Sequence, residues 1–412
     1  MDNFEGVYMR QKKFLFLTIQ QFVFLAYFIL TTAIFFIAVN QGNEGVTLKL
    51  FGGGDDGFFY WTQAKNIAAG QPARSTSIYP LIIGYLIKIT GIESVYVIRI
   101  FNYIGFILLI IFSLHLIEMF FKLEDEKIAL KYIYNAKILI LISFLFYASL
   151  QMNVNLSINR DVWIYTLYVL SIILSIKLIF YKKNKFLNFI LLLPSLWLLG
   201  EFRGYALVSF VLSIILFFSY KRFGKLKRPI LTFIILVALF GIYYTLFMNY
   251  RLPYINMSLR DALNYRDVTL TTYSGGSQMW IKLDHSFFGR FFINYIHSYI
   301  GNLLGPLPWH IRGISTLFVF FVETIPMFLI LRFLWKKRTI ITKMQRYVLI
   351  HAFVWISLIA VLNDNIGTAT RLRPVAWILI LVVFASLYSK NIFYHIMSRG
   401  NLEETIKPKR GP

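Results

Sequence analysis

The sequence predicts an all-α, polytopic membrane protein with about ten transmembrane helices. Of its 412 residues, 58% are hydrophobic and only 15% are charged. Soluble globular domains instead contain about 45–50% apolar and about 25% charged residues. The apolar residues also gather in long runs between polar flanks. We therefore expect most of the chain to lie in the hydrocarbon core of a membrane.

The candidate spans are apolar segments, and a full crossing needs roughly 20 residues. They cover residues 14–39, 97–121, 138–152, 162–180, 186–199, 204–220, 231–249, 314–334, 347–362 and 374–388. The first run is too long for the hydrophobic region of a signal peptide. No small-residue cleavage pattern follows it before Gln41. We expect it to remain as the first helix.

Clusters of Lys and Arg predict the orientation of the spans. They lie at residues 10–13, 182–185, 221–228, 336–346 and 407–410. Cytoplasmic ends of spans carry an excess of Lys and Arg, so we expect a multi-pass cell-membrane protein with both termini in the cytoplasm. This gives a membrane domain of residues 1–389 and a cytoplasmic tail of residues 390–412. The two large loops, 40–93 and 251–312, then lie on the outer face.

The formal net charge of +23 does not indicate a nucleic-acid partner. Most of the excess lies in the clusters that set the topology, which also attract anionic membrane lipids. No nucleic-acid-binding motif accompanies the charge. The absence of cysteine excludes disulfides and thiolate metal sites.

The outer face is unusually basic in this topology, and the positive-inside rule does not require that. Planar guanidinium groups match phosphate oxygens, so the set favours a phosphate-bearing lipid ligand. For any single arginine, the alternatives are contact with lipid head groups or local ion pairs such as Arg160–Asp161 and Glu201–Arg203. The basic residues singled out are Arg99, Arg160, Arg203, Arg371, Arg373 and Lys65.

The first outer loop places two adjacent carboxylates in the stretch FGGGDDGFFYWTQAKNIAAG, residues 51–70. Either Asp55 or Asp56 is a good N-cap for a helix, on which Tyr60 shares a face with Asp56. A second short helix is predicted to open at Pro80. It is apolar for only about ten residues, which predicts an interfacial or re-entrant helix and not a span.

This loop resembles the first outer loop of the GT-C superfamily of membrane glycosyltransferases. The motif is Asp-Gly-Phe-Phe-Tyr-x-x-x-Ala-Lys-x-x-x-x-Gly from Asp56, followed by Tyr79-Pro80 and Gly84. Within the superfamily it is similar to the bacterial lipid-A aminoarabinose transferases and protein O-mannosyltransferases. The family spacing is kept at Asp56, Tyr60, Ala64 and Lys65, and Gly57 stands where the family usually has Glu. The stretches EFRGYAL and GTATRLRPVAWIL resemble its later Arg-containing segments more loosely.

The resemblance implies an inverting transfer of a sugar from a polyprenyl-phosphate carrier to a glycan, lipid or protein acceptor on the outer face. A carboxylate at a loop–helix junction can take the acceptor proton, so Asp56 is the predicted base and Asp55 its helper. Helix capping, worth about 1 kcal/mol each, is the alternative role for both. The predicted substrate- and phosphate-binding residues are Arg203, Arg371, Arg373, Arg160, Arg99, Lys65, Tyr60 and Tyr79.

Two other functions compete with this prediction. A polymerase of lipid-linked polysaccharide repeat units has a similar number of helices and outer arginines, with one large outer loop late in the chain. A transporter or flippase for a lipid-linked sugar predicts inverted repeats and broken helices, and the sequence has no internal repeat. The motif at Asp56, directly after the first span, favours the transferase.

Other polar residues carry weaker expectations. No cofactor is required, although a divalent cation held by Asp55 and Asp56 with His297 or Asp284 has acceptable ligand types without a diagnostic spacing. Glu323 and His351 lie in predicted spans, where ionisable residues serve either function or pairing between helices. The prolines of GPLPWHI, residues 305–311, predict a break after the preceding helix.

Overall fold

The computed structural model of the protein describes residues 2–48, 56–122, 126–181, 184–223, 229–252, 254, 256–272, 277–283 and 286–406. Within these ranges the chain is helical, with three isolated β-bridges and no strand. The α-helices are α1 (Asp2–Asn40), α2 (Gly57–Ala68), α3 (Tyr79–Thr90), α4 (Val95–Phe121), α5 (Glu126–Phe146), α6 (Ala148–Asn155), α7 (Asp161–Ile176), α8 (Lys185–Phe202), α9 (Gly204–Phe223), α10 (Pro229–Leu246), α11 (Leu259–Thr272), α12 (Phe288–Leu304), α13 (Ile314–Val319), α14 (Ile325–Lys336), α15 (Lys343–Leu362), α16 (Ile366–Leu372) and α17 (Pro374–Ile406). The 3₁₀-helix η2 is Pro308–His310, and the π-helices are η1 (Lys177–Tyr181) and η3 (Phe320–Thr324).

All ten apolar segments predicted as spans fall on helices, which confirms the all-α prediction. In the described chain, seven helices are long and apolar enough to cross a membrane, as expected of a membrane-spanning protein. An eighth crossing results if α5 and α6, which are bent by 65°, form one span. The described apolar parts of α9 and α10 are shorter, at Gly204–Ser219 and Val237–Leu246, and this accounts for the difference from ten.

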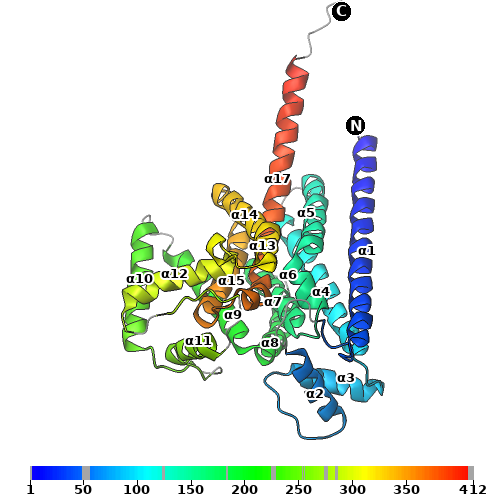
Figure 1. The fold of residues 1–412 in the computed structure, drawn as a ribbon. Coiled ribbons are helices and arrows are strands. Elements are labelled where there is room, and N and C mark those ends of the chain that lie inside the picture. The colour runs from blue at the N-terminus through cyan, green and yellow to red at the C-terminus, as the bar shows by residue number, and fades with distance from the viewer. Residues whose placement is uncertain are drawn as a thin grey trace, which may run out of the picture.

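The N-terminal end of α1 and the C-terminal end of α17 lie at one end of the helix bundle (Figure 1). Helices α2, α3 and α11, which belong to the two large loops, gather at the opposite end. The helix α17 runs on past the predicted boundary at residue 389 to Ile406.

Helix α17 forms the centre of the bundle. It packs against α4, α5, α7 and α15, and side chains such as Ile378 and Val382 are completely buried. Of its span, 78% is buried inside the protein, against 17% for the Ile314–Lys336 span, which therefore lies at the periphery. The segment that leads into α17 is consequently surrounded by other spans.

The helices α2 and α3 form a tightly packed pair after the first span. Gly84 of α3 lies against α2, where a Cβ atom would come within 2.7 Å of the Ile67 side chain. Pro80 occupies the first turn of α3 and Gly91, with φ of 67°, ends the helix in a left-handed conformation. The predicted short helix opening at Pro80 is thus confirmed.

The second large loop is held to the bundle by a buried ion pair. The Arg266 guanidinium of α11 lies 2.6 Å from Asp364, which follows α15, and also donates to the backbone oxygen of Ile281. Both charged side chains are buried and well supplied with hydrogen bonds. Helix α12 ends at Leu304, directly before the GPLPWHI stretch, so the predicted break is confirmed.

Candidate active site

Asp56 lies at the N-cap position of α2, as predicted, but its side chain does not cap the helix. Its Oδ2 atom instead accepts hydrogen bonds from the Tyr60 hydroxyl at 3.3 Å and from Arg371 Nη2 at 2.8 Å. Tyr60 is one helical turn further along the same face. The Asp56 side chain is 50% exposed. It is therefore both tethered and open to an incoming molecule.

Arg371 bridges two carboxylates that come from different parts of the chain. It lies in the last turn of α16, and its Nε donates to Asp161 Oδ2 at 2.5 Å while Nη2 contacts Asp56. Burial alone lowers the pKa of Arg371, but the charges of Asp161 and Asp56 raise it well above the ordinary value. The guanidinium group is therefore a permanent cation with a fixed orientation.

Asp161, the second carboxylate that contacts Arg371, is almost completely buried. It is the first residue of α7, where a negative charge is favoured by the helix dipole, and its side chain is 1% exposed. Its second oxygen, Oδ1, lies 3.5 Å from Arg203 Nη1, and Arg203 also donates to the Tyr205 hydroxyl at 2.8 Å. Asp161 thus holds two arginines at once.

Arg160 adds a third guanidinium to this site. Its guanidinium carbon lies 5.7 Å from the centre of the Tyr60 ring. Within the described residues, its Nε and Nη1 atoms are buried and make no hydrogen bond. Burial, together with the nearby charge of Arg203, lowers the pKa of Arg160. Tyr60 and Asp161 act in the opposite direction without cancelling these effects, so Arg160 is a cation that its surroundings compensate only in part.

We name this group the arginine–carboxylate cluster; its members are Asp56, Asp161, Arg160, Arg203 and Arg371. It combines three guanidinium groups with two carboxylates, so the cluster carries one excess positive charge. An unpaired buried guanidinium is costly. The cluster can therefore gain free energy by binding an anion.

Two buried tyrosines pack against each other beside the cluster, and one of them, Tyr60, contacts Asp56. The rings of Tyr60 and Tyr79 meet edge to face with 5.2 Å between their centres, and the Tyr79 hydroxyl donates to Asn102 Oδ1 at 3.2 Å. Burial raises the pKa of Tyr60 to about 12. Its phenol therefore stays protonated and remains a hydrogen-bond donor to Asp56 at neutral pH.

The other predicted basic residues lie outside the cluster and have partners of their own. Arg99 is buried and donates to the backbone oxygens of Gly45 and Val46 in the turn after α1. Lys65 pairs with Glu44 at 3.3 Å on the surface. Arg373 is buried beside Glu323, with 2.6 Å between Nη2 and Oε2. These contacts anchor local structure and place the three cations apart from Asp56.

The predicted divalent-cation site cannot be compared with the structure in full. Asp55 and Asp284 lie outside the described residues. Within the described part of the chain, no group of three or more His, Asp or Glu side chains is arranged to hold a metal ion. His297 lies on α12 and accepts a hydrogen bond from Trp309 at 3.2 Å.

The sequence alone did not reveal that Asp161 binds both Arg203 and Arg371. Adjacency in sequence predicts a pair of Asp161 with its neighbour Arg160, but consecutive residues on a helix point in different directions. Asp161 instead binds Arg371, which is 210 residues away. The available signal was an acidic residue in the first turn of an apolar helix beside a predicted phosphate ligand. His351 is likewise used between helices, because its Nδ1 lies 3.2 Å from the Tyr168 hydroxyl.

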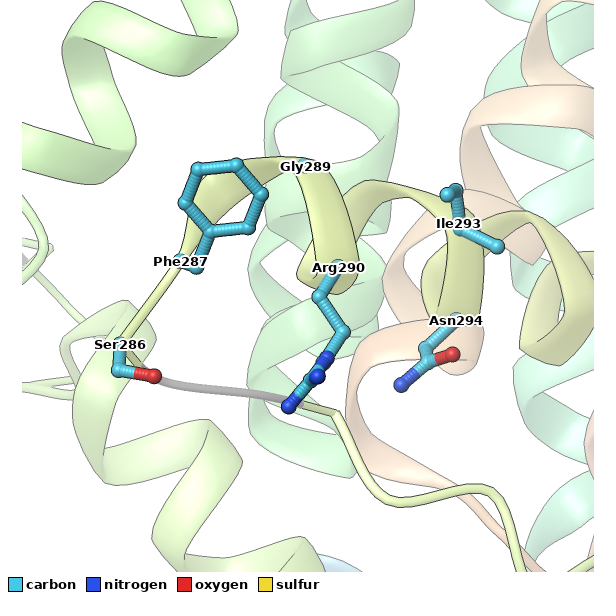
Figure 2. Close-up of a pocket in the computed structure, with 6 residues that line it drawn as sticks. All are labelled: Ser286, Phe287, Gly289, Arg290, Ile293 and Asn294. Atoms are coloured by element: carbon cyan, nitrogen blue, oxygen red, sulfur yellow. The ribbon is translucent and has the colours of Figure 1, made fainter.

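Two hollows, of about 510 and 550 Å³, lie along α12 and are lined by none of the cluster residues. Figure 2 shows the first, in which Arg290 and Asn294 project from the same side of α12 and Ser286 lies on the segment before the helix. The second lies between α10 and α12 and is mainly apolar. The first belongs to the second large loop, the second is shared with α10, and neither includes a residue of the site at Asp56.

Comparison of the chain with protein-family models, curated proteins and solved structures finds no match. The likeness to membrane glycosyltransferases therefore depends on the motif at residues 56–84.

Proposed function

We propose that the protein is a membrane glycosyltransferase of GT-C type that uses a polyprenyl-phosphate-linked sugar at the end of the bundle opposite its termini. One observation carries the proposal. A half-exposed carboxylate, Asp56, lies beside a group of guanidinium cations with an excess positive charge. A base for the acceptor and a binding site for the donor phosphate are thereby neighbours.

The chemistry requires one bond to form as another breaks. The acceptor hydroxyl oxygen attacks the anomeric carbon of the sugar, and its proton passes to Asp56. The bond between that carbon and the phosphate oxygen breaks, and polyprenyl phosphate leaves with the electron pair. Arg371 and Arg160 stabilise the leaving phosphate through charge-assisted hydrogen bonds. The attack comes from the face opposite the phosphate, which gives inversion.

The ion pair between Asp56 and Arg371 has a consequence for the order of events. The Oδ2 atom of Asp56 already accepts hydrogen bonds from Arg371 and Tyr60, so it is less available to an acceptor hydroxyl. The donor phosphate competes with the exposed Asp56 for Arg371, whereas the buried Asp161 keeps its hold on Nε. Donor binding thus releases Asp56 for proton transfer. We expect the donor to bind before the acceptor.

The proposal is tested with purified protein in liposomes that carry a synthetic polyprenyl-phosphate hexose in one leaflet. Donors that carry different hexoses are tested in turn, and a membrane extract supplies the acceptor. The release of polyprenyl phosphate is measured. The proposal predicts release coupled to transfer of one sugar. Movement of the intact donor between leaflets without release would instead indicate a flippase. Elongation of a lipid-linked repeat would indicate a polymerase.

A further inference from the structure

Arg373 follows Arg371 of the arginine–carboxylate cluster by two residues and forms a buried ion pair with Glu323. The Arg373 side chain is 0% exposed and that of Glu323 is 1% exposed. Buried charges are expensive unless they are paired and hydrogen-bonded. Glu323 meets this condition, since its two oxygens also accept hydrogen bonds from the Ser149 backbone N–H at 2.5 Å and hydroxyl at 2.7 Å.

The π-helix η3 places Glu323 at a junction of several helices. Such turns interrupt α-helices and recur at functional positions. The residue that follows, Thr324, donates to the backbone oxygen of Leu304 at the end of α12. Arg373 donates to the oxygen of Gly305 and lies over the ring of Trp377 at 4.1 Å. The ion pair therefore joins η3, α6, the end of α12 and the start of α17.

The segment between Arg371 and Arg373 is fixed at each residue. The backbone oxygen of Arg371 accepts the Tyr165 hydroxyl at 2.5 Å, and that of Leu372 accepts Trp355 Nε1 at 2.9 Å. The third attachment is the ion pair of Arg373 with Glu323. A guanidinium that must reach two carboxylates needs its backbone held to within a fraction of an ångström.

We infer that Glu323 is a positioning residue: through Arg373, it fixes the 371–373 segment so that Arg371 reaches Asp161 and Asp56 together. The inference rests on the proposed function, in which Arg371 binds the donor phosphate. Glu323 itself contacts no cluster residue in the described chain. Its direct link to the cluster is the ion pair with Arg373, on the short segment that carries both arginines.

The experiment combines a structural readout with a binding readout. The chain contains no cysteine, so Ala369→Cys introduces a single thiol at a fully buried position of α16. We expect Glu323→Gln to raise the maleimide labelling rate of this thiol about tenfold, because α16 opens more often. We also expect the Kd for a short-chain polyprenyl phosphate to rise about tenfold, together with a lower unfolding temperature, because Arg373 is left buried without its carboxylate.

Glu118→Gln is the control for loss of an interhelical ion pair; the Glu118 side chain is 45% exposed, against 1% for Glu323. Glu118 also pairs with a largely buried cation, Lys137, between two helices that do not carry the site. It should leave both the labelling rate and the Kd unchanged. If Glu323→Gln does not fold, Arg373→Lys tests the same link, because lysine keeps the charge but not the full set of contacts. Unchanged labelling and unchanged Kd in the Glu323 or Arg373 variant overturn the inference. If the unsubstituted protein does not bind polyprenyl phosphate, the proposed function fails, and the labelling rate alone decides the positioning role.

Discussion

The carboxylate of Asp56 and the guanidinium of Arg371 are joined at 2.8 Å across 315 residues of sequence. This pair ties the start of α2, next to the first span, to the end of α16, next to the last span. Asp161 holds the same arginine from a third helix. A site assembled from such distant segments depends on the helix bundle for its geometry, and its members have different energetic weights.

Asp161 and Asp56 should differ in what their removal does to stability. Asp161→Asn removes the carboxylate that pairs with Arg203 and one of the two that pair with Arg371, both of them largely buried arginines, which should cost about 3–5 kcal/mol. Asp56→Asn removes a half-exposed partner and should cost about 1 kcal/mol or less. Thermal unfolding in detergent measures both. Equal losses in the two variants would contradict the assignment of Asp161 as the buried anchor.

Arg371→Lys should weaken phosphate binding while the protein stays folded. Lysine cannot reproduce the planar fork that contacts two carboxylates and a phosphate. The loss of one charge-assisted hydrogen bond, about 1.5–3 kcal/mol, raises the Kd for polyprenyl phosphate about tenfold to a hundredfold. Arg74→Lys, at an exposed position of the first large loop, is the control. A Kd in Arg371→Lys equal to that of the control would exclude Arg371 as the phosphate ligand.

Acid should destabilise the fold through His310, which follows α12. Burial and the nearby His297 and Arg312 lower its pKa from 6.5 to about 4. Between these two values the unfolded chain binds more protons than the folded one, so stability falls as the pH drops from about 6.5 to 4. The loss is of the order of 2 kcal/mol. His310→Asn removes the titrating group, and its unfolding temperature should depend less on pH over this range. An identical pH dependence would disprove the assignment.

Close packing of α2 against α3 should be sensitive to a single methyl group. A Cβ at Gly84 would lie 2.7 Å from Ile67 and 3.0 Å from the backbone oxygen of Ala64. Gly84→Ala must push the helices apart, at a cost of about 1–3 kcal/mol, and it should displace Asp56 enough to reduce transfer. Gly313→Ala adds its methyl group in open space and serves as the control. Wild-type stability and transfer in Gly84→Ala would show that this contact is unimportant.

Much of the architecture follows from the sequence because its signals are local. Apolar length predicted the ten helical segments, and Pro80 predicted the opening of α3. The prolines after Leu304 predicted the end of α12. The number of crossings was less accessible, since it depends on how α5 meets α6 and how far the described apolar parts of α9 and α10 extend.

The partners of the arginines were not predictable in the same way. Arg99, Arg203, Arg371 and Arg373 all lie at or near helix ends and look alike in sequence. Packing over long sequence separations directs Arg99 to backbone oxygens, Arg373 to Glu323, and the other two to Asp161. The helical spacing of Asp56 and Tyr60 predicted their proximity correctly, because that contact spans a single helical turn.

The role of Asp56 in transfer is the central claim, and one comparison tests it most directly. Purified protein and its Asp56→Asn variant are placed in liposomes with the polyprenyl-phosphate hexose and the acceptor that support transfer, and the initial rate of polyprenyl phosphate release is measured. Glu93→Gln, an exposed acid of the same large loop, is the control. Loss of the base predicts a rate at least about a hundredfold below wild type, with normal membrane insertion and unfolding temperature. If the Asp56→Asn variant instead releases polyprenyl phosphate at a rate within about threefold of wild type, this result contradicts the role of Asp56 as the base.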